Sequence, residues 1–152
     1  MKISLRKATK SDADLTFKIE QFSIKEYADS LYFTGKRAYH NEFNHTNIQI
    51  VELNEMQNIQ AIGYLEIEEK SYSFEIINIL IHKDFQNQGF GKFLLNEIIH
   101  EAQSKSKSIE LQVLKNNPRA KRFYENAGFQ VYFETEFEFK MKFSHANRIF
   151  RN

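Results

Sequence analysis

Alternating apolar and polar positions recur along the chain and predict most of its strands. Residues 2–7 carry Ile3 and Leu5 on one face of a first strand. Residues 47–81 fit three further strands, with turns near Asn54–Asn58 and Glu69–Ser71. The tail alternates again, with apolar positions at Phe137, Phe139, Met141 and Phe143.

The strand that ends near residue 81 has apolar residues on both faces. Ile76 and Leu80 lie on one face, and the opposite face carries Ile77, Ile79 and Ile81. A strand that is apolar on both sides is typical of the middle of a sheet. We therefore expect this strand to be central.

Apolar residues at helical spacing predict helices between the strands. Ser11 and Asp12 are suited to cap a first helix, and a second is expected over about residues 35–44. A third follows Gly91, with its apolar face at Leu94, Leu95, Ile98 and Ala102. Because this helix lies between the central strand and a strand with Ile109, Leu111 and Val113, the two strands are expected to be parallel.

The helix between residues 117 and 128 has the clearest boundaries. Asn117 is a suitable N-cap, Pro118 fits the first helical position and Gly128 fits the position after the last turn. Together these patterns predict an α/β (α+β) fold with a mixed, mostly antiparallel sheet, a central parallel strand pair and about four helices. Without a repeat or a linker-like segment, we expect a single domain over residues 1–152.

Composition and charge narrow the possible functions. The formal net charge is +1, which argues against non-specific binding to nucleic acid or membranes. The chain has no cysteine, so disulfides, cysteine metal sites and a cysteine nucleophile are excluded. His40 and His45 lack further ligands for zinc, and no metal is expected. No signal sequence or membrane-spanning run is recognisable, and we expect a cytoplasmic protein.

Two of the five glycines, Gly89 and Gly91, lie where the central strand passes into the third helix. A helix N-terminus at the carboxyl end of a parallel strand offers unpaired N–H groups to an anion, and glycine lets a ligand approach the backbone. The stretch is not a Walker A loop, because Gln86 and Phe93 stand where glycine and Ser or Thr are required. It also lacks the third glycine of the dinucleotide-binding motif, since residue 94 is Leu.

The pattern that fits is Gln/Arg-x-x-Gly-x-Gly, formed by Gln86, Asn87, Gln88, Gly89, Phe90 and Gly91. It is preceded by "INILIHKDFQ" and followed by a second pattern, which consists of Val113, Asn117, Ala120, Tyr124 and Gly128-Phe129. With these motifs, and with its opening "ISLRKATKSDADL", the chain resembles the GNAT superfamily of N-acetyltransferases. The resemblance is clear over about residues 75–130 and extends to about residues 1–22.

The resemblance implies acetyl-CoA as co-substrate and a parallel strand pair that splays to admit it. Backbone groups of Ile79, Leu80 and Ile81 would then pair with pantetheine. The N–H groups of Gln86, Asn87, Gln88, Gly89, Phe90 and Gly91 would hold the pyrophosphate. Asn117 would bind the cofactor in addition to capping its helix.

Attack of an amine on a thioester needs a base for the amine and an acid for the leaving thiolate. The resemblance makes Tyr124 the candidate general acid, although a tyrosine on an amphipathic helix also fits a core position. Some relatives carry a Glu where this chain has Gln112, which cannot accept a proton. Glu75, acting through water, is then the tentative base; Glu66 and His82 are further options, and both carboxylates also fit solvated strand positions.

The expected activity is acetyl-CoA-dependent N-acetyl transfer to a primary amine of a small molecule or peptide, by direct attack through a tetrahedral intermediate. The alternative is a non-catalytic acyl-CoA-binding or sensing module of the same fold. An acceptor pocket is expected from the segment that contains Glu20, Glu26, Tyr27, Asp29, Tyr32, Phe33 and Tyr39, although an ordinary amphipathic helix pair also explains it. The alternating C-terminal strand makes a homodimer a further possibility.

Overall fold

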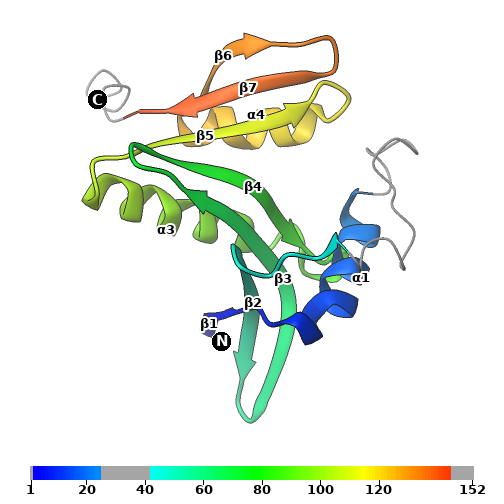
Figure 1. The fold of residues 1–152 in the computed structure, drawn as a ribbon. Coiled ribbons are helices and arrows are strands. Elements are labelled where there is room, and N and C mark those ends of the chain that lie inside the picture. The colour runs from blue at the N-terminus through cyan, green and yellow to red at the C-terminus, as the bar shows by residue number, and fades with distance from the viewer. Residues whose placement is uncertain (1, 25–41, 145–152) are drawn as a thin grey trace. The chain divides into compact units, whose positions relative to one another are not determined.

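The computed structural model describes residues 2–24 and 42–144 of the chain. The chain divides into two compact units, and Figure 1 labels their helices and strands. The first unit contains Met1–Ile67 and Asn78–Phe93, and the second contains Glu68–Ile77 and Leu94–Asn152. Within the described residues, no helix is long and apolar enough to cross a membrane.

Seven strands form a mixed sheet in the order β1-β2-β3-β4-β5-β7-β6. Their bounds are β1 Lys2–Lys7, β2 Ile48–Glu55, β3 Asn58–Glu69, β4 Ser73–Ile81, β5 Ser108–Leu114, β6 Gln130–Glu134 and β7 Glu138–Phe143. The predicted fold class is confirmed: β4 is central in the order, and β4 and β5 are parallel. The strand β6 was not predicted from the sequence.

Three α-helices are described: α1 Ala13–Ile24, α3 Phe90–Ser104 and α4 Pro118–Ala127. Two short 3₁₀ helices precede α1 and α3, namely η1 Lys10–Asp12 and η2 Lys83–Phe85. The helix expected over residues 35–44 lies almost entirely outside the described residues. The other three expected helices are present, and the predicted apolar face of α3 is buried at Leu94, Leu95, Ile98 and Ala102.

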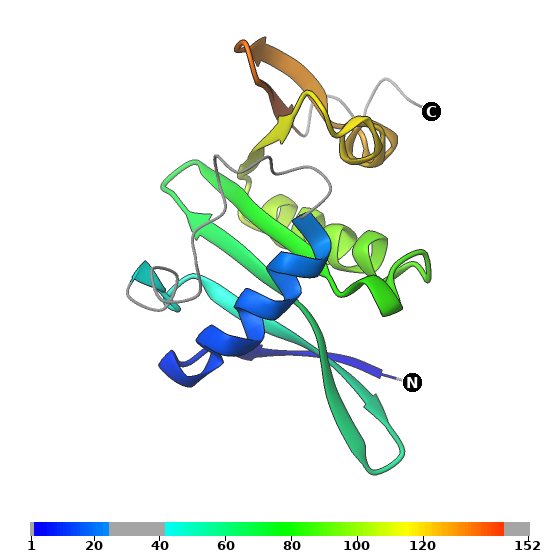
Figure 2. The same ribbon diagram turned by 90° about the vertical axis from the view of Figure 1, so that its right-hand side faces the viewer.

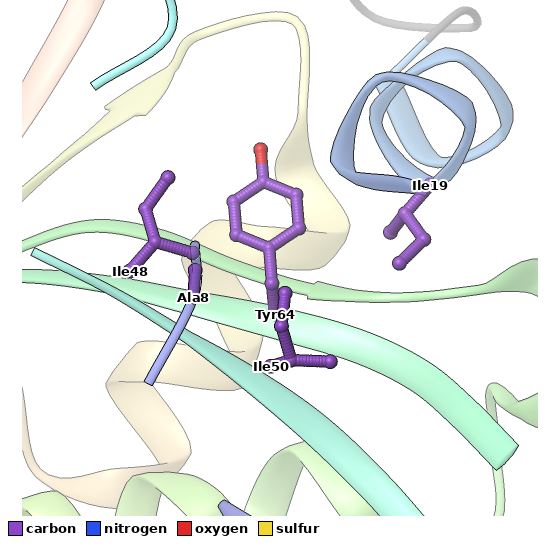
Figure 3. Packing of buried hydrophobic residues seen from close by; sticks show 5 residues of the cluster. All are labelled: Ala8, Ile19, Ile48, Ile50 and Tyr64. Atoms are coloured by element: carbon purple, nitrogen blue, oxygen red, sulfur yellow. The ribbon is translucent and has the colours of Figure 1, made fainter. Parts of the chain in front are cut away.

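In the first unit, β1, β2 and β3 are joined by antiparallel pairing, and α1 lies across one face of β2 and β3 (Figure 2). A buried cluster fills this face; it contains Ala8, Ile19, Ile48, Ile50 and Tyr64 (Figure 3). The register pairs Ile50 with Tyr64 and Ile48 with Glu66. Because side chains alternate along a strand, Tyr64 and Glu66 point to the same face as this core.

The start of α1 is fixed by charge pairing more than by a simple cap. Arg6 donates two hydrogen bonds to Asp12, at 2.9 and 3.0 Å, and one to Glu52 at 2.8 Å. Asp12 also accepts a bond from the Thr9 N–H at 2.8 Å, so it closes η1 before α1 begins. The bonds from Arg6, which outweigh the effect of burial, lower the pKa of Asp12.

The second unit is built on the parallel pair. Ser73–Ile76 of β4 pairs with Ser108–Leu111 of β5, and β5, β7 and β6 continue with antiparallel pairing. The helix α4 lies beside β5 (Figure 1). All five residues of the edge strand β6 are exposed, whereas Met141 and Phe143 of β7 are buried.

Candidate functional site

The turn between β4 and α3 is shaped by two residues in the left-handed region. Asn87 has φ 61° and Gly89 has φ 86°. A Cβ atom built at Gly89 would meet no atom within 4 Å, so the backbone at this point faces open space. The torsion, and not crowding by neighbouring atoms, therefore accounts for glycine here.

Glutamine side chains hold this turn in place. The Gln86 amide donates to the Ile81 carbonyl at 2.8 Å, and the Gln88 amide donates to the Asp84 carbonyl at 3.2 Å. His82 closes η2 by accepting the Asp84 N–H at 3.3 Å. Gln86 thus ties the turn back to the last residue of β4, a contact that its place in the motif did not reveal.

The backbone N–H groups at the start of α3 are the candidate anion-binding element of the turn. The first helical hydrogen bond runs from the Phe93 N–H to the Gly89 carbonyl at 3.0 Å. Helix geometry leaves the preceding N–H groups without helical partners. Within the described part of the chain, the N–H groups of Gly89, Phe90 and Gly91 donate no hydrogen bond, whereas the Gln86 N–H bonds the Lys83 carbonyl at 3.3 Å. The Phe90 side chain is buried, so only its backbone is suited to ligand contact.

The end of β4 packs very closely against β3. The His82 N–H donates to the Ile62 carbonyl at 2.7 Å. A Cβ atom at Gly63 would lie 2.2 Å from the Leu80 carbonyl oxygen and 3.2 Å from the Ile81 Cα. Gly63 therefore fixes the position of the segment expected to meet pantetheine. Sequence analysis passed over it, although a glycine inside a strand signals close backbone approach.

A cavity of about 250 Å³ opens in the first unit. It is lined by Glu20, Glu42, Phe43, Asn44, Ile48, Tyr64, Glu66 and Asn78. The Tyr64 hydroxyl lies 3.4 Å from a Glu20 oxygen, and the Asn78 amide donates to Glu66 at 2.8 Å. Figure 3 shows the Tyr64 ring rising from β3 between Ile48 and Ile19.

Burial raises the pKa of Glu66, and the hydrogen bond from Asn78 partly offsets this effect. Glu20 and Glu66 were expected from the sequence, whereas Tyr64 and Asn78 were not, because only strand register brings them beside the two glutamates. The other predicted acceptor residues, Glu26, Tyr27, Asp29, Tyr32, Phe33 and Tyr39, lie outside the described residues. Among residues 2–24 and 42–144, no group of three or more His, Cys, Asp or Glu side chains is arranged to hold a metal ion.

The boundaries of α4 are those predicted. The Asn117 side chain accepts the Ala120 N–H at 3.0 Å, Pro118 is the first helical residue and Gly128 has φ 106°. The Asn117 oxygen is thus engaged in capping.

Tyr124 lies in an aromatic cluster on the inner side of α4. Its ring centroid is 5.1 Å from that of Phe123 and 5.5 Å from that of Phe129, both with edge-on geometry. Burial raises the pKa of Tyr124, so the phenol keeps its proton at neutral pH. Within the described residues, its hydroxyl makes no hydrogen bond. A protonated hydroxyl without a partner is suited to donate to a ligand atom.

The tentative base Glu75 forms an ion pair with Lys70 in the second unit. Gln112 is exposed on β5, where its register partner on β7 is Lys140. The two candidate bases therefore differ in their neighbours, because Glu75 has a cationic partner whereas Glu66 has a neutral one.

The sequence pattern of the acetyltransferase (GNAT) domain matches residues 45–131, more than half of the chain. A comparison with curated proteins finds no sequence match. Solved structures do match. PaiA N-acetyltransferase from Thermoplasma acidophilum in complex with coenzyme A has a TM-score of 0.72 and 17% identity, with coverage of 95% of this chain and 100% of that chain.

An acetyltransferase from Thermus thermophilus has a TM-score of 0.74 and 18% identity, with coverage of 94% and 97%. The ribosomal-protein-S18-alanine N-acetyltransferase from Escherichia coli has a TM-score of 0.66 and 18% identity, with coverage of 93% and 92%. These likenesses agree with the mixed sheet and its central parallel pair. Because the family pattern covers the glycine turn and the helix with Tyr124, we conclude that the chain belongs to the GNAT acetyltransferase domain family.

Proposed function

We propose that the protein is an acetyl-CoA-dependent N-acetyltransferase that acts on a primary amine. The single observation that carries this proposal is the glycine turn, in which the N–H groups of Gly89, Phe90 and Gly91 donate no hydrogen bond to the described residues. A helix N-terminus with such donors binds phosphate through both hydrogen bonds and the helix dipole. Family membership supports a nucleotide thioester as the ligand.

In this proposal the backbone of Gln86–Gly91 forms the turn that holds the pyrophosphate of acetyl-CoA. The donors are chiefly the N–H groups of Gly89, Phe90 and Gly91, since the Gln86 N–H already bonds the Lys83 carbonyl. The backbone of Ile79–Ile81 pairs with pantetheine. Asn117 contacts the cofactor through the polar groups that do not take part in capping. The Gln86 side chain has a structural part, because its bond to Ile81 sets the distance between strand end and turn. No metal takes part.

The reaction begins with the neutral amine. Its nitrogen attacks the acetyl carbonyl carbon, a C–N bond forms, and a backbone N–H near Ile81 stabilises the oxyanion. The C–S bond then breaks, the nitrogen gives up one proton to a base, and the sulfur takes one from the Tyr124 hydroxyl. The products are an acetamide and the free thiol of coenzyme A, and water returns the proton from the base to Tyr124.

Two carboxylates compete for the role of base. Glu75, acting through water, is one, but its ion pair with Lys70 favours a structural role. Glu66 is the other, and the pKa that burial raises brings it closer to the working pH of a general base. The kcat of Glu66→Gln compared with that of Glu75→Gln separates the two.

The proposal is tested with the purified full chain in two steps. Calorimetry should detect saturable binding of coenzyme A, and Gly89→Ala should lower the affinity. Release of free thiol from acetyl-CoA should then rise with at least one member of a panel of alkylamines, diamines and peptides with free N-termini. If coenzyme A gives no heat, the proposal is wrong at its first step.

A non-catalytic acyl-CoA-binding module is the second candidate, and Gln112, at a position where some relatives carry a Glu, favours it. Coenzyme A binding without thiol release from any amine in the panel would support this module and exclude the enzyme.

We also propose a single cytoplasmic domain over residues 1–152. The alternating C-terminal segment expected to pair two copies forms β7, which is not an edge because it lies between β5 and β6. We therefore propose a homodimer through the edge strand β6, where Val131, Tyr132 and Phe133 are 40%, 53% and 56% exposed. Light scattering at dilute concentration tests the homodimer, which a monomer mass would exclude.

A further inference from the structure

All the charged residues among those that line the cavity of the first unit are acidic. Three of its eight lining residues are glutamates, Glu20, Glu42 and Glu66, and none of the eight is Lys or Arg. Paired carboxylates in a recess repel one another and attract cations into it. The lining therefore favours a positively charged occupant over a neutral or anionic one.

The cavity has two polar points, each of which consists of a carboxylate and a neighbouring polar side chain. At one point, the Asn78 amide donates to Glu66 at 2.8 Å. At the other, the Tyr64 hydroxyl lies 3.4 Å from a Glu20 oxygen. Tyr64 is only 1% exposed, and it is fixed by the packing of the core cluster. A ligand with two charged ends has a partner at each point.

The remaining walls suit an aliphatic chain. Phe43, Ile48 and the Tyr64 ring line the cavity beside the carboxylates. Aromatic faces attract alkylammonium groups, and apolar side chains accommodate methylene groups. The volume of about 250 Å³ is small. It lies below the roughly 300–1,000 Å³ that is usual for drug-sized ligands.

We propose that this cavity binds the acceptor as a short aliphatic diamine or polyamine, with one ammonium group beside Glu66 and Asn78 and the other beside Glu20 and Tyr64. This inference rests on the proposed acetyl transfer and names the amine that enters it. Glu42, which is exposed at the cavity, adds attraction for the incoming cation.

The first test compares acceptors of equal length at saturating acetyl-CoA. These are 1,4-diaminobutane, butylamine and 4-aminobutanoate, which carry a second positive charge, no second charge and a negative charge. We expect kcat/KM for the diamine to exceed that for butylamine by about tenfold or more, as one or two partly exposed charge pairs would give. The carboxylate analogue should be the poorest acceptor.

The second test removes the charge at the point formed by Glu20 and Tyr64. Glu20→Gln should raise KM for 1,4-diaminobutane about tenfold and leave KM for butylamine within about twofold. The matched control is Glu55→Gln, which changes an exposed glutamate of β2 outside the cavity and should alter neither value.

A third measurement does not depend on turnover. Calorimetry of the full chain with 1,4-diaminobutane alone should detect binding that Glu20→Gln and Glu66→Gln each weaken and Glu55→Gln does not. Equal use of all three acceptors, or diamine binding that these variants leave unchanged, overturns the diamine assignment while the acetyltransferase stands. A preference for peptide N-termini over the diamine overturns it as well. Absence of coenzyme A binding, in contrast, refutes the proposed function itself.

Discussion

Asn78 of β4 donates a hydrogen bond of 2.8 Å to Glu66 of β3, and this bond opposes the effect of burial on the Glu66 pKa. The bond stabilises the ionised carboxylate. Loss of this hydrogen bond would favour the protonated form of Glu66 still more.

Asn78→Leu should therefore raise the pKa of Glu66 beyond its present raised level. If Glu66 is the base, the acidic limb of the kcat/KM profile should move to higher pH, while the affinity for acetyl-CoA is retained. The measurement is a pH–rate profile for wild type and variant with one amine. An unchanged acidic limb would remove Glu66 from the role of base.

Glu66 also imposes a cost on folding. Since its folded pKa is raised above the unfolded value, the folded state binds the proton more tightly, so its contribution favours folding at low pH and is lost as pH rises through the folded pKa. Glu66→Gln should stabilise the protein near pH 7 by up to about 1 kcal/mol, since the carboxylate is only half-buried. Urea unfolding at pH 7 and pH 4 measures this gain, which should vanish at the lower pH.

The contribution of Asp12 to stability depends on pH in the opposite direction. Its folded pKa is depressed by the Arg6 hydrogen bonds, so its stabilisation is present above the unfolded pKa and is lost as pH falls through the folded pKa. Asp12→Asn should cost about 1–3 kcal/mol at pH 7, because charged hydrogen bonds from Arg6 and the Thr9 cap are lost or weakened. The deficit should shrink on acidification. An equal deficit at every pH would contradict the assignment.

Tyr124→Phe tests the general acid. The ring contacts with Phe123 and Phe129 remain available to Phe, so folding and affinity for coenzyme A should change little. Loss of the proton donor should lower kcat by about 10²–10⁴-fold. Steady-state kinetics and calorimetry on the same preparation give both values. Full activity would assign Tyr124 to the core alone.

Gly63 and Gly89, both in the first unit, should respond differently to a methyl group. At Gly89 the substitution to Ala meets no atom and adds about 1–2 kcal/mol of left-handed backbone strain, with weaker binding of coenzyme A. At Gly63 the methyl group would lie 2.2 Å from the Leu80 carbonyl oxygen, so Gly63→Ala should lower the free energy of unfolding by at least about 2 kcal/mol. Denaturant unfolding of both variants, with Asn87→Gly as a tolerated control, checks the contrast.

Sequence analysis predicted elements whose signals are local. The helix α4 carries its cap, its proline and its terminal glycine within one short segment, and the structure places all three as predicted. The strand β6 was missed because Gln130–Glu134 is exposed throughout and presents no alternation of buried and exposed positions. The family motifs, in turn, identified the glycine turn that the structure shows at the start of α3.

No local sequence signal of this kind predicts the cavity. Tyr64, Glu66 and Asn78 come from two strands, and only the register of β2, β3 and β4 places them beside Glu20 of α1. Asp12 illustrates the same difficulty, because its strongest partner, Arg6, belongs to β1 and lies outside the local capping pattern. Contacts between elements that are distant in sequence can be identified only when the fold is known.

The positive φ of 86° at Gly89 has a stereochemical consequence. A residue of mirror-image chirality favours positive φ, and its methyl group would point away from the position where an L-residue carries one. D-alanine introduced at residue 89 by chemical ligation should thus be tolerated there. By narrowing the freedom of the unfolded chain, it would make the whole protein harder to unfold.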